Sequence, residues 1–293
     1  MVLESLIQSK TLLRHPITTM ILAIILSSAS MWLAYATFPN SASILSLAFI
    51  TIGFMPVMFR VLQREEKEES HVHASSLTFI ERHFHLIKVF AFFFIGLMLS
   101  YSFWYVVLPN DVKSSIFKEQ ESTLKGIEQL RAQLTGYAIL NGKSCSNDFF
   151  CWMEIVFINN SIVLFLAIIL SFAFAAGSIF LLGWNASIIG VVIGKDILAV
   201  LPSYSGFGLL APFLAYLHGF YNAVGLVPHG VPEILGYLVG AIAGGIISVT
   251  ITKRHLHKGE FEIMAKDAAV LIIIALLLLL IGAVIEAGFL AAG

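Results

Sequence analysis

Three ionisable residues in the apolar second half of the chain have side chains that could bind a metal. His229 and Glu233 are four residues apart, so they share one face of a helix, and His218 precedes them. Two histidines and a carboxylate, with water in the open fourth position, form a ligand set of catalytic zinc. The arrangement suggests a metal-dependent hydrolase with zinc bound by His218, His229 and Glu233. His229 and Glu233 are then the catalytic candidates.

The same residues also have a purely structural interpretation. The chain has no His-Glu-x-x-His motif, and no second carboxylate lies nearby in the sequence to act as a base. Pro228 and Pro232 are suited to opening a helix near the membrane surface. There the Glu233 carboxylate would favour the positive end of the helix dipole, and the histidines would form hydrogen bonds. The sequence favours this interpretation, in which the protein is not an enzyme and needs no cofactor.

Polar side chains within apolar runs are costly in lipid and are therefore candidates for function. Six of them form the predicted functional cluster: Asn159, Asn160, Asn185, His218, His229 and Glu233. A continuous path lined by Asn185, His218 and Glu233 would instead make the protein a channel or transporter for small solutes. Glu286 lies in the last apolar run, where its nearness to the helix end favours snorkelling to the interface.

The composition places these residues in a membrane. Of 293 residues, 58% are hydrophobic and only 12% are charged, whereas soluble proteins carry about 25% charged residues. The mean hydropathy is +0.91. The chain is therefore predicted to be an all-α, polytopic transmembrane bundle with the lipid bilayer as its first partner. The net charge of −1 gives no indication of nucleic-acid binding.

The apolar runs predict about seven crossings. Runs at 17–37, 41–62 and 87–108 are each about 20 residues long, as a span requires. A span over 156–182 is expected to end in a turn at Gly183-Trp184-Asn185. The Lys and Arg residues near the ends of the runs all fall on one side of the membrane if the region between 183 and 253 crosses it an even number of times. A re-entrant or broken helix pair is therefore expected between 185 and 230.

The distribution of Lys and Arg also sets the orientation. The basic ends belong in the cytoplasm, so the protein is predicted to be a multi-pass cell-membrane protein with a cytoplasmic N-terminus and an outside C-terminus. The loop at 109–153 is then extracytoplasmic, and it carries Cys145 and Cys151. Two cysteines so close together can form a disulfide in an oxidising compartment, or they can remain reduced thiols.

A family resemblance rests on two groups of motifs. The first is Phe157-Ile158-Asn159-Asn160 opening a long span, with Gly177 within it and Leu181-Leu182-Gly183-Trp184-Asn185 after it. The second is Leu226-Val227-Pro228-His229-Gly230-Val231-Pro232-Glu233. Together these motifs resemble the stage II sporulation protein M family. Ala186, where the family usually has glycine, and Pro232, directly before Glu233, depart from its pattern.

The resemblance implies a membrane scaffold, because the sporulation member is similar to a protein that gathers peptidoglycan-degrading partners. We expect the chain to act through self-association or a membrane-protein partner. Four regions are predicted: a three-span part at 1–108 with a cytoplasmic loop at 63–86, the extracytoplasmic loop at 109–153, a core like that of the family at 154–252, and a cytoplasmic linker with the last span at 253–293.

Overall fold

The fold consists of membrane-spanning helices. The computed structural model describes residues 12, 15–71, 79–137, 145, 148–174, 178–252 and 258–292. Within these residues every regular element is a helix. Seven segments within the described residues are long and apolar enough to cross a membrane: Pro16–Thr37, Pro39–Leu62, Phe84–Val107, Phe149–Ala173, Ile179–Ala223, Pro228–Ser248 and Met264–Ala292. The predicted all-α polytopic bundle is confirmed.

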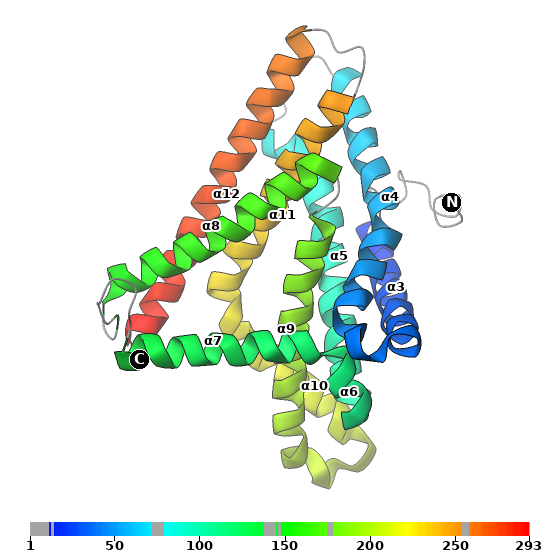
Figure 1. The fold of residues 1–293 in the computed structure, drawn as a ribbon, viewed down its shortest axis with the longest axis vertical. Helices are drawn as coiled ribbons and strands as arrows, with labels where there is room; N and C mark the ends of the chain where they lie inside the picture. The colour runs from blue at the N-terminus through cyan, green and yellow to red at the C-terminus, as the bar shows by residue number, and fades with distance from the viewer. Residues whose placement is uncertain are drawn as a thin grey trace.

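The first two spans form a helical hairpin. Helix α3 (Pro16–Thr37) begins with a proline, whose missing N–H costs nothing at the first position of a helix. The short 3-10 helix η1 (Pro39–Ser41) reverses the chain. Helix α4 (Ala42–His71) then returns along α3, and the two helices pack together (Figure 1).

The expected loop at 63–86 is largely helical. Helix α4 continues to His71, and α5 (Phe79–Val107) begins well before the expected start of its span at residue 87. The charged segment after Leu62 consists of Arg, Glu and Lys, which have high helix propensity, so a helix can continue beyond the bilayer. Thr78-Phe79-Ile80-Glu81 has the spacing of a capping box at the start of a helix, but Thr78 lies outside the described residues.

Two helices occupy the predicted extracytoplasmic loop. They are α6 (Asn110–Ile116) and α7 (Lys118–Tyr137). Figure 1 shows α7 lying across one end of the bundle, roughly at right angles to α9. The first turn of α7 is fixed to two spans by Gln120. Its Oε1 accepts a hydrogen bond from Ser43 Oγ at 2.7 Å, and its Nε2 donates to Ser187 Oγ at 3.1 Å.

The next reversal lies earlier than expected. Helix α8 (Phe149–Phe174) ends before the predicted limit of 182, and α9 (Ile179–Val200) continues through the predicted turn at Gly183-Trp184-Asn185. The residues on both sides of the reversal are apolar, so hydropathy could not locate it. Asn185 is tolerated within α9 because its Nδ2 donates to the carbonyl of Leu181 at 2.8 Å.

The expected broken helix pair follows α9. The chain turns through the 3-10 helix η2 (Leu201–Leu210), returns as α10 (Ala211–Ala223) and passes through η3 (Val224–Leu226). Helix α10 has 13 residues and is about 20 Å long, which is too short to cross hydrocarbon about 30 Å thick. Gly208 in η2 has φ 56° and ψ −126°, a conformation that essentially requires glycine.

The last two spans are α11 (Val227–Thr252) and α12 (Lys258–Ala292). Figure 1 shows the successive long helices running alternately up and down the long axis, with α8 crossing obliquely and α10 returning only part of the way. With an odd number of crossings in the described chain, α3 begins at one end of the bundle and α12 finishes at the other. The end of α12 lies at the same end as α7.

The spans pack in two groups. Helices α3, α4, α5 and α9 form one, and α8, α11 and α12 form the other. Glycines allow the close approaches, as the spacing of Gly236, Gly240 and Gly244 predicts. A Cβ on Gly236 would lie 3.1 Å from the carbonyl oxygen of Ala275 on α12, and one on Gly244 would lie 2.5 Å from that of Ile168 on α8.

Candidate functional site

A polar cluster lies inside the group formed by α8, α11 and α12. Nδ2 of Asn160 on α8 donates to Oε1 of Glu233 on α11 at 2.7 Å. The hydroxyl of Tyr237, one turn further along α11, donates to Oδ1 of Asn160 at 2.8 Å. Asn160 and Tyr237 are both buried. The Asn160 amide therefore uses its donor and its acceptor to join α8 to α11.

Glu286 completes this cluster. Its side chain lies beside that of Glu233, which brings α12 against α11. Glu286 therefore contacts a second carboxyl within the protein, and the expectation that it snorkels to the interface was wrong.

Glycine makes room for this contact. Gly282 lies one turn before Glu286 on α12, and a Cβ there would lie 2.6 Å from Cγ of Glu233 and 3.2 Å from the carbonyl oxygen of His229. The small residue allows α11 and α12 to approach closely at the cluster. A larger side chain at Gly282 would displace Glu233.

His229 and Glu233 share the face of α11 that contacts α12. The His229 ring packs against Phe289 with ring centroids 6.2 Å apart. Its Nδ1 is buried, with no hydrogen-bond partner among the described residues. Helix α11 begins at Val227, so Glu233 lies beyond the first turn, where a carboxylate does not benefit from the dipole. The dipole interpretation of Glu233 was therefore wrong.

The remaining predicted polar residues lie in other surroundings. His218 on α10 contacts Tyr204 of η2, with 2.9 Å between its Nδ1 and the tyrosine hydroxyl. Asn185 is hydrogen-bonded within α9, and Asn159 is exposed on α8. In the part of the chain that the structure describes, no group of three or more His, Cys, Asp or Glu side chains is arranged to hold a metal ion.

Sequence reasoning missed Tyr237 and the role of Glu286. Tyr237 follows Glu233 by four residues, so the helical period places both on one face, and this spacing was the available signal. The contact between Glu233 and Glu286 joins two different helices, and sequence spacing carries no information about it. The cluster can hold three helices together in lipid, where hydrogen bonds between helices contribute about 0.6–2 kcal/mol each.

An apolar cavity separates the two groups of helices. It has a volume of about 380 Å³, and its lining residues come from α5, α9, α10, η3 and α11. Among them are Phe94, Ile193, Phe220 and Leu235. None of the six predicted polar residues lines this cavity.

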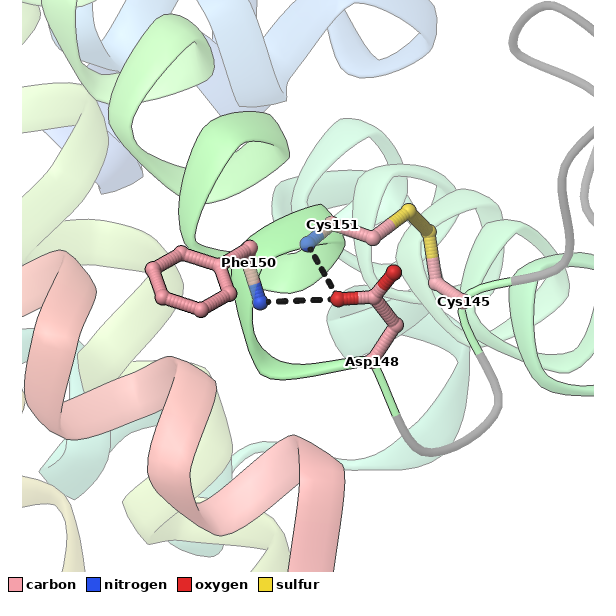
Figure 2. The surroundings of a disulfide bond; sticks show 4 residues. All are labelled: Cys145, Asp148, Phe150 and Cys151. Atoms are coloured by element: carbon pink, nitrogen blue, oxygen red, sulfur yellow. Dashed lines mark hydrogen bonds between the residues drawn. A yellow bond between two sulfur atoms is a disulfide. The ribbon is translucent and has the colours of Figure 1, made fainter.

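A disulfide and a helix cap lie together at the start of α8. Cys145 and Cys151 are joined by a disulfide. Between them, Asp148 Oδ1 accepts hydrogen bonds from the backbone N–H groups of Phe150 at 3.0 Å and Cys151 at 3.1 Å. Figure 2 shows the carboxylate capping the first turn of the helix beside the disulfide. The cap and the bridge together fix where α8 begins.

Comparison with known proteins assigns the family. The model of the family described as stage II sporulation protein M matches residues 89–289. The match covers more than half of the chain and includes all four residues of the polar cluster. No curated protein and no solved structure matches the chain. The chain belongs to the stage II sporulation protein M family.

Proposed function

We propose that this multi-pass membrane protein is an assembly platform that binds a partner protein through the hairpin formed by α9, η2 and α10. The observation that carries the proposal is an apolar surface on this hairpin, beyond the level at which the membrane ends. Chemistry and transport have weaker support, because the polar side chains of the spans bind one another.

Helix α7 marks where the membrane ends. Its sequence begins Lys118-Glu119-Gln120-Glu121 and continues with Lys125 and Glu128, and so many charges cannot lie in hydrocarbon. Figure 1 shows η2 further out along the long axis than α7. The tip of the hairpin therefore lies outside the hydrocarbon layer.

The surface of this tip is nevertheless apolar. Leu209 is 100% exposed, and five large side chains around it are also exposed: Phe207, Leu210, Phe213, Leu217 and Tyr221. Soluble surfaces seldom carry an apolar patch of this kind unless it binds a protein or a membrane. These exposed side chains leave the patch open to a partner protein.

We also propose that the end carrying α7, the hairpin and the C-terminus faces the outside of the cell. The disulfide between Cys145 and Cys151 fits an oxidising compartment. The following Lys and Arg residues fall toward the opposite end by their position in the sequence: Lys10, Arg14, Arg60, Arg64, Lys67, Arg82, Lys88, Lys253, Arg254, Lys258 and Lys266. The partner is then an extracytoplasmic protein or domain.

Photo-crosslinking in living cells tests the proposal. A photoreactive benzoylphenylalanine in place of Leu209 should give a discrete covalent adduct with another protein. The same residue in place of Lys125, on the same side but away from the patch, serves as the matched control. The absence of an adduct at Leu209, or equal adducts at both positions, would contradict a partner site on the hairpin.

A further inference from the structure

Helix α8 is the least covered span of the described chain. Only 22% of its apolar window is buried, compared with 33–61% for the other six. Its exposed side chains include a repeat in steps of three and four residues, with the exposed Phe165 at its edge: Asn159, Ile162, Leu166, Ile169 and Ala173. This 3.5-residue repeat is the spacing of a seam at which two helices pack knobs into holes.

One member of this seam is an amide near the middle of the membrane. Asn159 is exposed, and it lies two residues from Ser161, the middle residue of the span Phe149–Ala173. The displacement from the middle is about 3 Å along the helix. Asn159 is therefore deep in the hydrocarbon layer.

The fold leaves this amide poorly satisfied. Its Nδ2 has one long hydrogen bond, to Asn160 Oδ1 at 3.5 Å, and Oδ1 of Asn159 accepts none from the described residues. The same Asn160 oxygen already accepts the Tyr237 hydroxyl at 2.8 Å. An amide facing lipid is costly, and pairing with a polar group on another helix relieves the cost.

The exposed face of α12 provides a contrast within the same group of helices. Between residues 269 and 284 its exposed side chains are apolar: Ala269, Val270, Ile273, Leu276, Leu277, Leu280, Ile281 and Val284. Lipid alone can cover such a face, because none of these side chains has a polar group that needs a hydrogen-bond partner. The face of α8 differs from it by the amide at mid-membrane depth.

We propose that α8 packs against α8 of a second copy of this chain, with the two Asn159 amides paired across a two-fold axis. Copies inserted with the same topology have their α8 helices parallel and at the same depth, so Asn159 meets Asn159. An amide is its own complement, because its N–H donates and its oxygen accepts. A single asparagine within an otherwise apolar seam also fixes the register of the pair.

This inference rests on the proposed assembly role, but it uses a different surface and a different partner. The α8 seam lies within the membrane, whereas the hairpin tip lies outside it. The two can therefore fail separately. Dimerisation is measured with purified protein in vesicles, where no other protein is present, and the hairpin adduct is measured in cells.

The first experiment places benzoylphenylalanine at Phe165 of the full-length protein, in phosphatidylethanolamine–phosphatidylglycerol vesicles at high lipid-to-protein ratio. The control position is Ile25, which is 61% exposed on α3 in the other group of helices. Irradiation should give a covalent dimer at Phe165 and only lipid adducts at Ile25. Lipid adducts alone at Phe165, or equal dimer at both positions, would overturn the proposal.

The second experiment tests the amide. Asn159→Leu should weaken dimerisation about 3-fold to 30-fold, the range measured for hydrogen bonds between helices in membranes, whereas Asn159→Gln should retain more of it. Single-molecule photobleaching in dilute vesicles gives the dimer fraction, and gel filtration with circular dichroism confirms that each variant is folded. A folded Asn159→Leu protein that dimerises like the unmodified chain would show that the amide does not pair.

Discussion

Asn160 and Glu233 are 73 residues apart in the sequence, yet Nδ2 of the first donates to Oε1 of the second at 2.7 Å. This bond joins α8 to α11 in the membrane, and the contact of Glu233 with Glu286 extends it to α12. Glu233, one of the two catalytic candidates, thus takes part in holding three spans together.

The first prediction concerns this cluster. Asn160→Leu removes the donor to Glu233 and the acceptor for Tyr237, and leaves both groups buried without that partner. The free energy of unfolding should fall by about 1–3 kcal/mol. Glu233→Gln should change it far less, because the amide oxygen still accepts from Asn160 and the amide nitrogen can donate to Glu286. Thermal unfolding in detergent measures both.

Tyr237→Phe is the matched control, because it removes only one hydrogen bond of the cluster and should have an intermediate effect. Metal analysis of the same preparations adds a separate test. Stoichiometric zinc in the unmodified protein that disappeared in Glu233→Gln would contradict a purely structural role and would support the hydrolase instead.

The second prediction concerns the contact between α8 and α11. Gly244→Ala would place a Cβ 2.5 Å from the carbonyl oxygen of Ile168, so the two helices must separate. Overpacking of this kind costs about 1–3 kcal/mol, and the apparent melting temperature should fall. Gly230→Ala on the same helix is the control, because a Cβ there meets nothing within 4 Å. Equal melting temperatures for the two variants would refute the close approach.

The third prediction concerns the start of α8. Asp148→Ala removes a carboxylate that caps two backbone N–H groups, and should cost about 1 kcal/mol. Replacing Cys145 and Cys151 by serine should cost roughly 2 kcal/mol at most, because the ring is short. Hydrogen exchange should show faster exchange confined to the first turns of α8. Mass analysis that found both thiols free in protein from an oxidising compartment would argue against the bridge and weaken the proposed orientation.

The fourth prediction concerns orientation. A single reporter cysteine at Lys125, on α7, should react with a membrane-impermeant maleimide in intact cells. One at Lys258, the first residue of α12, should react only after the cells are opened. The native cysteines are bridged and should not react. The reverse pattern would invert the proposed topology.

Much of the bundle could be predicted from hydropathy and from the distribution of charge. The first span was expected over 17–37, and α3 covers Pro16–Thr37. The broken helix pair was expected because the basic residues require an even number of crossings, and η2 with the short α10 forms it. These features follow from the cost of placing charges and free backbone groups in lipid.

Other features depend on contacts between segments distant in sequence. The end of α8 could not be located because apolar residues continue on both sides of the reversal. Asn160 was included among the polar candidates, but its partners are 73 and 77 residues away, and the sequence did not indicate them. His218 was grouped with His229 from nearness in the sequence, whereas it contacts Tyr204 in the hairpin. Such pairings are set by how the helices pack.

The position of Gln120 has a consequence for the order of events during synthesis. Its amide bridges Ser43, which the ribosome has already made, and Ser187, which follows 67 residues later. At 5–20 residues per second, that interval lasts roughly 3–13 s. Helix α7 can dock fully only after α9 has been inserted. In the proposed orientation, the nascent segment therefore remains open to extracytoplasmic chaperones and disulfide-forming enzymes during this interval, and the oxidation of Cys145 and Cys151 can precede its docking.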